Sequence, residues 1–176
     1  MDGRNGKQME KLCWSRDRFK GNKLIITDRG ETVGAIERGK LFYSEATAVL
    51  NGRRFFLKRD FLLFKFEIYD ANNQTLLGTV ILGPLNSRSE LLLNGKRFVL
   101  EINNFQQTNW CWRFDGQRII TYKAPGLLSK ARGEAELFIP ETEELEILLL
   151  LGMFIRNQFI LMGIVSLILL GYIIFL

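Results

Sequence analysis

The sequence predicts a mainly β protein, a closed antiparallel β-barrel wrapped around a hydrophobic helix, with a C-terminal transmembrane helix. Three observations support this fold class. Short apolar runs alternate with tight turns, no helical period of useful length occurs before Glu141, and the chain ends in a long apolar stretch. We expect a polar segment over 1–10, a barrel domain over 11–158 with its central helix at about 142–156, and a transmembrane anchor over 159–176.

Five hairpins are predicted from turn signals at short spacing. Asn, Asp and Gly tolerate the positive φ that both central residues of a type I′ turn require, and the flanking runs are rich in β-branched and aromatic residues. We count ten or eleven strands between Lys11 and Ile139. An open sheet of that many strands would leave long exposed edges, so closure into a barrel is favoured. The turns are Arg29-Gly30-Glu31, Asn51-Gly52, Ala71-Asn72-Asn73-Gln74, Asn94-Gly95 and Asp115-Gly116.

Many of these strands are apolar on both faces. The runs FFL (55–57), FLLF (61–64) and ELLL (90–93) do not alternate cleanly between apolar and polar residues. A barrel with a watery lumen would not need an apolar inner face. The inner face is therefore expected to pack against a large apolar object, which the segment after Pro140 supplies.

That segment begins as a helix. Thr142 can cap it, and acidic residues in the first turn suit the positive end of the helix dipole. A single helix from Thr142 to Leu176 would be roughly 52 Å long. A barrel about 20–26 Å tall cannot bury it, and a bilayer core of about 30 Å cannot hold it without strong tilt. We therefore place a division at Arg156-Asn157-Gln158, where the chain would leave the barrel and meet the lipid headgroups.

Three other arrangements of the tail stay open. They are one tilted membrane helix from Ile147 to Leu176, a hairpin of two half-helices, and a wholly soluble protein that buries the entire segment. The run 159–176 is uncharged and mostly Leu and Ile, which is rare in soluble cores. The residues expected to form the anchor are Phe159, Ile160, Leu161, Ile164, Leu167, Leu170, Tyr172 and Phe175.

The charge distribution indicates an anionic partner. Residues 1–140 hold all but one of the basic residues and all but four of the acidic ones, 23 against 15, a net charge of +8. A basic domain beside an apolar tail favours a membrane leaflet with anionic phospholipid as the partner. No nucleic-acid motif is present, and no signal peptide is visible at the start. We expect a single-pass protein, anchored at its C-terminus, whose soluble domain faces the cytoplasm.

Catalytic chemistry is not expected. The chain has no histidine, which removes the commonest general base and metal ligand. No nucleophile elbow, P-loop or dinucleotide fingerprint occurs, so we expect no cofactor, no metal and no enzymatic activity. Cys13 and Cys111 are expected to be reduced thiols.

One basic and aromatic run is the best candidate for binding lipid. Arg53, Arg54, Lys58 and Arg59 lie in a predicted strand, and Arg156 would join them at the tail exit. The alternative is a solvated outer face whose aromatic residues pack on a neighbouring strand. Trp110 and Trp112 share a strand face opposite Cys111, and either the membrane interface or the barrel core would suit them.

The order of elements resembles that of the tubby C-terminal-like superfamily, which includes the tubby domain, the phospholipid scramblases and the plant LURP-one-related proteins. Comparable pieces here are IITDRGETVGAI (25–36), EIYDANNQTLLGTVI (67–81), RFDGQRIIT (113–121) and the apolar helix ELEILLLLG (144–152). The resemblance implies a closed barrel around a hydrophobic, nearly C-terminal helix. It also suggests a role with lipid.

Departures from the family pattern limit what the resemblance implies. The acidic run Glu141, Glu143, Glu144 and Glu146 has helical spacing and no Gly-centred loop, so we interpret it as a helix start and not as a calcium site. The phosphoinositide-binding residues of tubby domains do not align here, and the run 159–176 is additional. Three functions follow as hypotheses: a non-catalytic, membrane-anchored barrel that interacts with anionic lipid, an adaptor for protein partners that the tail merely positions, and a lipid scramblase.

Overall fold

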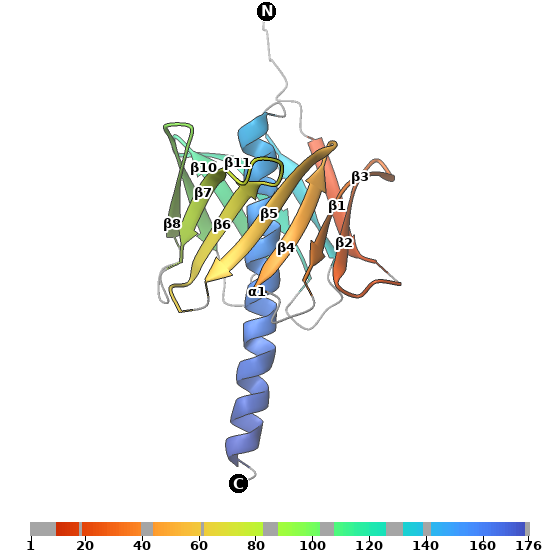
Figure 1. Ribbon diagram of the computed structural model, residues 1–176, viewed down its shortest axis with the longest axis vertical. Coiled ribbons are helices and arrows are strands. Elements are labelled where there is room, and N and C mark those ends of the chain that lie inside the picture. The colour runs from red at the N-terminus through yellow and green to blue at the C-terminus, as the bar shows by residue number, and fades with distance from the viewer. Residues whose placement is uncertain are drawn as a thin grey trace, which may run out of the picture.

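The computed structural model describes residues 10–17, 19–39, 44–60, 62–82, 88–102, 108–125, 132–138 and 142–174, and side chains within them between residues 11 and 158. These residues form twelve strands and one helix (Figure 1). The strands are β1 (Glu10–Arg16), β2 (Lys23–Asp28), β3 (Glu31–Arg38), β4 (Glu45–Leu50), β5 (Arg53–Asp60), β6 (Lys65–Asp70), β7 (Leu76–Ile81), β8 (Arg88–Leu93), β9 (Lys96–Ile102), β10 (Asn109–Phe114), β11 (Gln117–Lys123) and β12 (Arg132–Leu137), and the helix is α1 (Glu143–Ile174).

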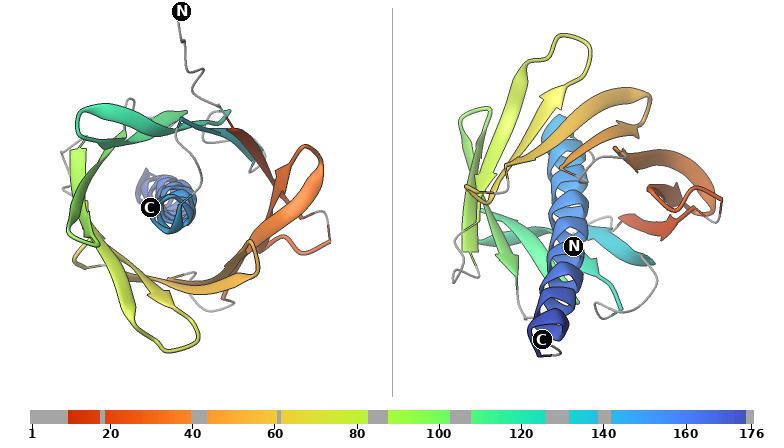
Figure 2. Two further views of the ribbon diagram at one scale, coloured as in Figure 1. Left: turned by 90° about the horizontal axis from the view of Figure 1, so that it is seen from above. Right: turned by 60° about the horizontal axis from the view of Figure 1, so that its bottom comes forward.

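The twelve strands form one antiparallel sheet that curls into a nearly closed barrel around α1 (Figure 2). The sheet order is β7-β6-β5-β4-β3-β2-β1-β12-β11-β10-β9-β8. Its two edge strands, β7 and β8, meet through side chains, because a Cβ on Gly78 of β7 would lie 2.8 Å from Cδ1 of Leu91 on β8. A mainly β antiparallel barrel is therefore confirmed, but it is nearly closed and not fully closed as predicted, because no ladder hydrogen bonds join β7 and β8 among the described residues.

The predicted hairpin turns are confirmed by their backbone angles. Asn51 has φ of 49° and Gly52 of 80°, and the same left-handed pair recurs at the β2–β3, β8–β9 and β10–β11 turns. Both residues of a two-residue type I′ turn need this conformation. Together with the longer β6–β7 turn, these turns lie at one end of the barrel, which we call the turn end.

The ring closes through a pairing that the turn signals did not reveal. β1 runs antiparallel to β12, from Glu10 opposite Leu137 to Ser15 opposite Arg132. Our count of ten or eleven strands falls short of the twelve observed among the described residues, because β1 and β12 have no hairpin turn between them. Their inward residues are few, among them Trp14 and Ala135.

The inner face of the barrel packs on the first half of α1, as the apolar strands predicted. Side chains from Leu145 to Ile155 are almost all buried. Phe154 meets Phe66 of β6 edge to face, with ring centroids 6.0 Å apart. Trp112 Nε1 and Tyr122 Oη each donate a hydrogen bond of 2.9 Å to the carbonyl oxygen of Leu148. Of the two locations considered for Trp110 and Trp112, the barrel core is the one observed, since both side chains are buried.

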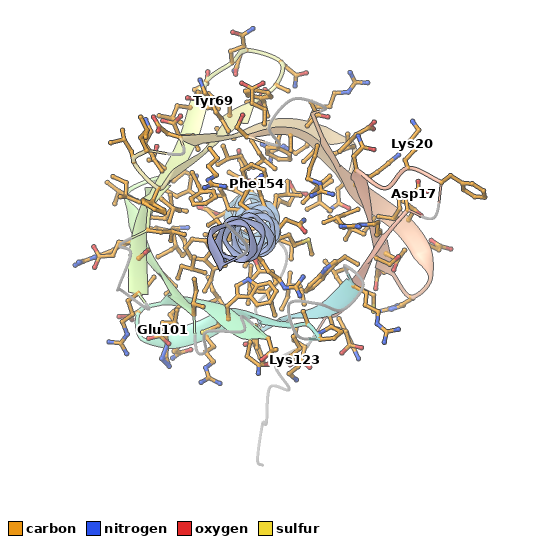
Figure 3. All side chains as sticks on the ribbon, turned by 90° about the horizontal axis from the view of Figure 1, so that it is seen from below. Asp17, Lys20, Tyr69, Glu101, Lys123 and Phe154 are labelled. Atoms are coloured by element: carbon orange, nitrogen blue, oxygen red, sulfur yellow. The ribbon has the colours of Figure 1, made fainter. Side chains whose placement is uncertain are left out.

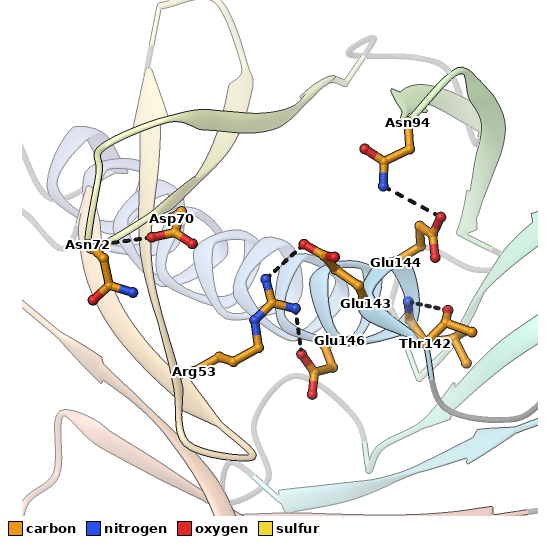
Figure 4. A network of polar contacts seen from close by, with 9 residues as sticks. Arg53, Asp70, Asn72, Asn94, Thr142, Glu143, Glu144 and Glu146 are labelled. Carbon is orange, nitrogen blue, oxygen red and sulfur yellow. Dashed lines mark hydrogen bonds and ion pairs between the residues drawn. The ribbon is translucent and has the colours of Figure 1, made fainter.

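The first turn of α1 is fixed to the turn end by ion pairs (Figure 4). Arg53 donates to Glu143 at 2.8 Å and to Glu146 at 3.1 Å. Lys96 Nζ donates to Glu144 at 2.8 Å. The acidic run is thus a helix start, as predicted, and its carboxylates orient the helix in the barrel.

Glu144 should make the stability of the fold depend on pH. Its hydrogen bond with Lys96 lowers its pKa from 4.5 to about 2. Since the folded pKa is below the unfolded one, the stabilisation is fully present above about pH 4.5 and is lost as pH falls toward 2. In denaturant titrations, Glu144→Gln should lower the free energy of unfolding more at pH 7 than at pH 3. Glu31→Gln, at an exposed position, is the control, and an equal Glu144→Gln effect at both pH values would contradict the prediction.

The helix does not end where the sequence predicted. We expected the central helix to stop at about residue 156, yet α1 continues without interruption through Arg156, Asn157 and Gln158 to Ile174. All three residues are compatible with a helix, and their side chains are buried inside the barrel. These three polar residues therefore interrupt the apolar sequence but not the helical backbone. The second half of the helix projects from the barrel (Figure 1).

Within the part of the chain that the structure describes, no helix has the length and hydropathy of a membrane span.

Candidate functional site

The candidate site is the end of the barrel from which α1 leaves, which we call the exit end. It is formed by the last residues of the odd-numbered strands and the first residues of the even-numbered strands, opposite the turn end. Figure 3 views it from below, with Lys20, Asp17 and Lys123 on the outer rim and the helix in the centre. Arg38, Arg59 and Arg156 are buried at this end.

Arg156 lies inside the mouth of the barrel and not on its surface. It is 3% exposed. Its Nη2 donates to the carbonyl oxygen of Pro125 at 3.0 Å, and its guanidinium lies 5.5 Å from the centroid of the Trp110 ring. Nε is buried without a hydrogen-bond partner among the described residues. Burial lowers the pKa of Arg156 to about 10, which leaves it charged at neutral pH.

Two further arginines surround the helix at the same end. Arg59 Nη1 donates to Oε1 of Gln158 at 3.1 Å, and burial lowers the pKa of Arg59. Arg38 Nη2 donates to the carbonyl oxygen of Gly21 at 3.2 Å. These hydrogen bonds, like that of Arg156, go to neutral oxygen atoms. Burying an arginine costs several kcal/mol unless its charge is compensated, so these hydrogen bonds offset part of the cost of placing three arginines where the helix emerges.

The five residues predicted to bind lipid do not form one surface. Arg59 and Arg156 lie in the mouth at the exit end, whereas Arg53 is at the turn end with its two glutamates. Arg54 and Lys58 are exposed on the outer wall of β5. The lipid-binding role of all five stays a prediction.

The outer wall of β5 carries mixed charge. Lys58 lies opposite Glu45 of β4 on one side and opposite Glu67 of β6 on the other. Phe56 packs against Tyr69, with ring centroids 6.2 Å apart. This arrangement matches the alternative interpretation of a solvated face with aromatic packing. Sequence reasoning missed the two glutamates because strand register brings them beside Lys58.

The predicted anchor falls outside the residues whose side chains are described. The backbone of α1 continues to Ile174, and Phe175 lies beyond the described chain. The predicted anchor contacts of Phe159, Ile160, Leu161, Ile164, Leu167, Leu170, Tyr172 and Phe175 therefore stay predictions.

A groove of about 580 Å³ opens at the exit end, between β1, β12, β11 and β10. Trp14, Ala124 and Pro125 supply apolar lining, and Lys123 and Arg132 supply cations. Lys123 is paired with Glu136 at 2.7 Å. Sequence reasoning missed this groove, because it forms where β12, which had no turn signal, begins beside the end of β11.

Comparisons with known proteins give information on the fold. No family model matches the sequence, and no curated protein matches it either. A solved structure, the X-ray structure of a protein from Arabidopsis thaliana, matches with a TM-score of 0.58 and 12% sequence identity. The match covers 84% of this chain and 90% of that one. At this identity the similarity shows a shared fold and nothing about activity.

Proposed function

We propose that this chain is a non-catalytic, membrane-anchored barrel that rests with its exit end on an anionic bilayer surface. Residues 159–176 would be the anchor. They contain no charged residue and, as a helix, would be roughly 27 Å long, near the lower limit for a span. We also propose kinship with the tubby-like barrels, which the arrangement of one helix inside a strand ring supports. The barrel would face the cytoplasm.

One observation carries the proposal: the two ends of the barrel differ in sequence. The five hairpin turns at the turn end contain no large apolar residue, although the β12–α1 connection at that end holds Phe138 and Ile139. Each of the six connections at the exit end contains at least one Phe or Leu, and together they hold four basic residues and one acidic residue. The exit-end connections are DRFKGN (17–22), GKLFYS (39–44), FLLF (61–64), LGPLNS (82–87), NNFQQT (103–108) and APGLLSKA (124–131).

This difference is one of sequence, and it suits a bilayer at the exit end. Apolar residues flanked by Lys and Arg match the boundary between acyl chains and anionic headgroups. The helix leaves the barrel on the same side, so the anchor and the apolar connections would reach one membrane together. The buried guanidinium of Arg156 places a positive charge at the same end.

Membrane partitioning of the full chain and of a chain ending at Gln158 tests the proposal. The full chain should stay in membranes through a carbonate wash, and the shortened chain should be soluble and β-rich by circular dichroism. Leu167→Arg should weaken retention, since a central charge costs about 2.5–3.5 kcal/mol on insertion scales. Leu167→Ala is the matched control.

Lipid preference is tested with the same shortened chain. At low salt it should bind vesicles that contain anionic lipid and not neutral vesicles, and added salt should release it. Full chain extracted by carbonate would contradict the anchor. Equal binding of the shortened chain to neutral and anionic vesicles would contradict the role of charge.

A second candidate function, a protein adaptor, is supported by the seam. Leu76 and Ile81 of β7 and Leu92 of β8 are exposed apolar residues on the two edge strands. Edge strands with free backbone groups are places where a partner strand can add. A protein that co-purifies with the full chain and is lost on Leu92→Asp would favour this function.

A further inference from the structure

Two loop tips at the exit end present exposed apolar side chains beside an aspartate that accepts backbone hydrogen bonds. In the β1–β2 connection, Asp17 Oδ1 accepts hydrogen bonds from the backbone N–H of Phe19 at 2.8 Å and of Lys20 at 3.2 Å. The Phe19 side chain is 97% exposed. A carboxylate that accepts hydrogen bonds from the backbone N–H groups two and three residues later stabilises the turn. The ring of Phe19 therefore points outward and does not fold back.

The β5–β6 connection repeats the same device. Asp60 Oδ1 accepts from the backbone N–H of Leu62 at 3.0 Å and of Leu63 at 3.2 Å. Leu62 is 86% exposed and Leu63 is 60% exposed. An unrelated sequence thus produces the same geometry at the same end of the barrel.

These tips leave apolar area in water, which is unfavourable in proportion to that area. A loop tip is free to carry polar residues, as the turns at the other end of the barrel do. The presence of Phe19 at one tip and of Leu62 and Leu63 at the other therefore points to a partner that covers them. In each turn the aspartate is occupied by two N–H donors, and Lys20 adds a cation beside Phe19.

We propose that the Phe19 tip and the Leu62–Leu63 tip insert into the interfacial layer of a lipid bilayer. This inference rests on the proposed function and goes beyond it, since it adds a membrane contact separate from the anchor. Both tips lie on the rim of the end from which α1 leaves the barrel, with β3 and β4 between them in the sheet. Two tips on the rim and one central helix would fix the tilt of the barrel against the membrane.

Tryptophan scanning of the full chain in vesicles tests the insertion. Phe19→Trp and Leu62→Trp each add a fluorophore at a tip, and Leu92→Trp adds one at a 70% exposed apolar position on the barrel wall. The native Trp14, Trp110 and Trp112 are buried and contribute the same background to every variant. The vesicles contain phosphatidylcholine and phosphatidylserine with bromine on the acyl chains, and unbrominated vesicles serve as reference.

At the tips, the added emission should shift to the blue and lose more intensity to bromine than in Leu92→Trp. If the chains co-sediment with the vesicles but bromine quenches the tip emission no more than that of Leu92→Trp, the insertion is contradicted. That outcome would not contradict the anchor. Full chain that does not co-sediment overturns the proposed function and the insertion together. Equal melting temperatures of the three variants and the wild type show that the substitutions preserve the fold.

Discussion

Replacing Phe154 with alanine should lower the free energy of unfolding by about 3–5 kcal/mol, the range for removing a large aromatic residue from a core. Phe154 is fully buried where α1 meets β6, and its ring lies edge to face on Phe66. The barrel wall surrounds it, so neighbouring strands cannot collapse into the space without breaking their ladders. The loss should therefore lie toward the upper part of the range.

Thermal unfolding of the full chain in detergent, followed by tryptophan fluorescence, measures this loss. The midpoint should fall by on the order of 10 °C for a chain of this size. Phe19→Ala makes the same chemical change at a position exposed in water and should leave the midpoint nearly unchanged. Equal losses in the two variants would show that Phe154 does not lie in the core.

Gly152→Ala should destabilise the protein by about 1–3 kcal/mol, the usual cost of overpacking, although alanine favours a helix by about 1 kcal/mol over glycine. A Cβ at position 152 would lie 2.4 Å from Oη and 2.5 Å from Cζ of Tyr122. Tyr122 cannot move aside, because its ring stacks on Trp110 with centroids 4.8 Å apart. The substitution would also displace the hydroxyl from the carbonyl oxygen of Leu148.

The matched control for this substitution is Gly21→Ala. A Cβ on Gly21 would meet nothing within 4 Å, so the unfolding midpoint should change little. If Gly152→Ala instead stabilises the chain, as expected for an uncrowded helix position, then Tyr122 and the helix are not in the tight contact described above.

Local signals made much of the fold predictable. The Asn51-Gly52 type of turn dictates a hairpin by backbone conformation alone, so the strands that flank each turn followed directly. The helix start followed from Thr142, whose Oγ1 accepts from the backbone N–H of Leu145 at 3.4 Å. The apolar inner faces of the strands predicted a large apolar partner in the core. That partner is α1, the helix predicted after Pro140.

What the sequence did not reveal depends on contacts between distant segments. Arg156 was expected at the lipid headgroups, yet its guanidinium reaches Pro125 and Trp110 inside the mouth. Lys58 sits beside two glutamates that only strand register brings near. The exposed tip at Phe19 could have been found from its sequence, since Asp-x-Phe-Lys is a turn signal with an aromatic residue at its apex.

The closing pair of strands and the position of the helix have a consequence for the order of folding. β1 must wait for β12, more than a hundred residues later in the chain, before the ring can close. The helix residues that fill the ring come later still. Non-local pairing of this kind is slow and exposes apolar surface while it is incomplete. During synthesis, nearly all of the barrel wall therefore leaves the ribosome before its own core exists.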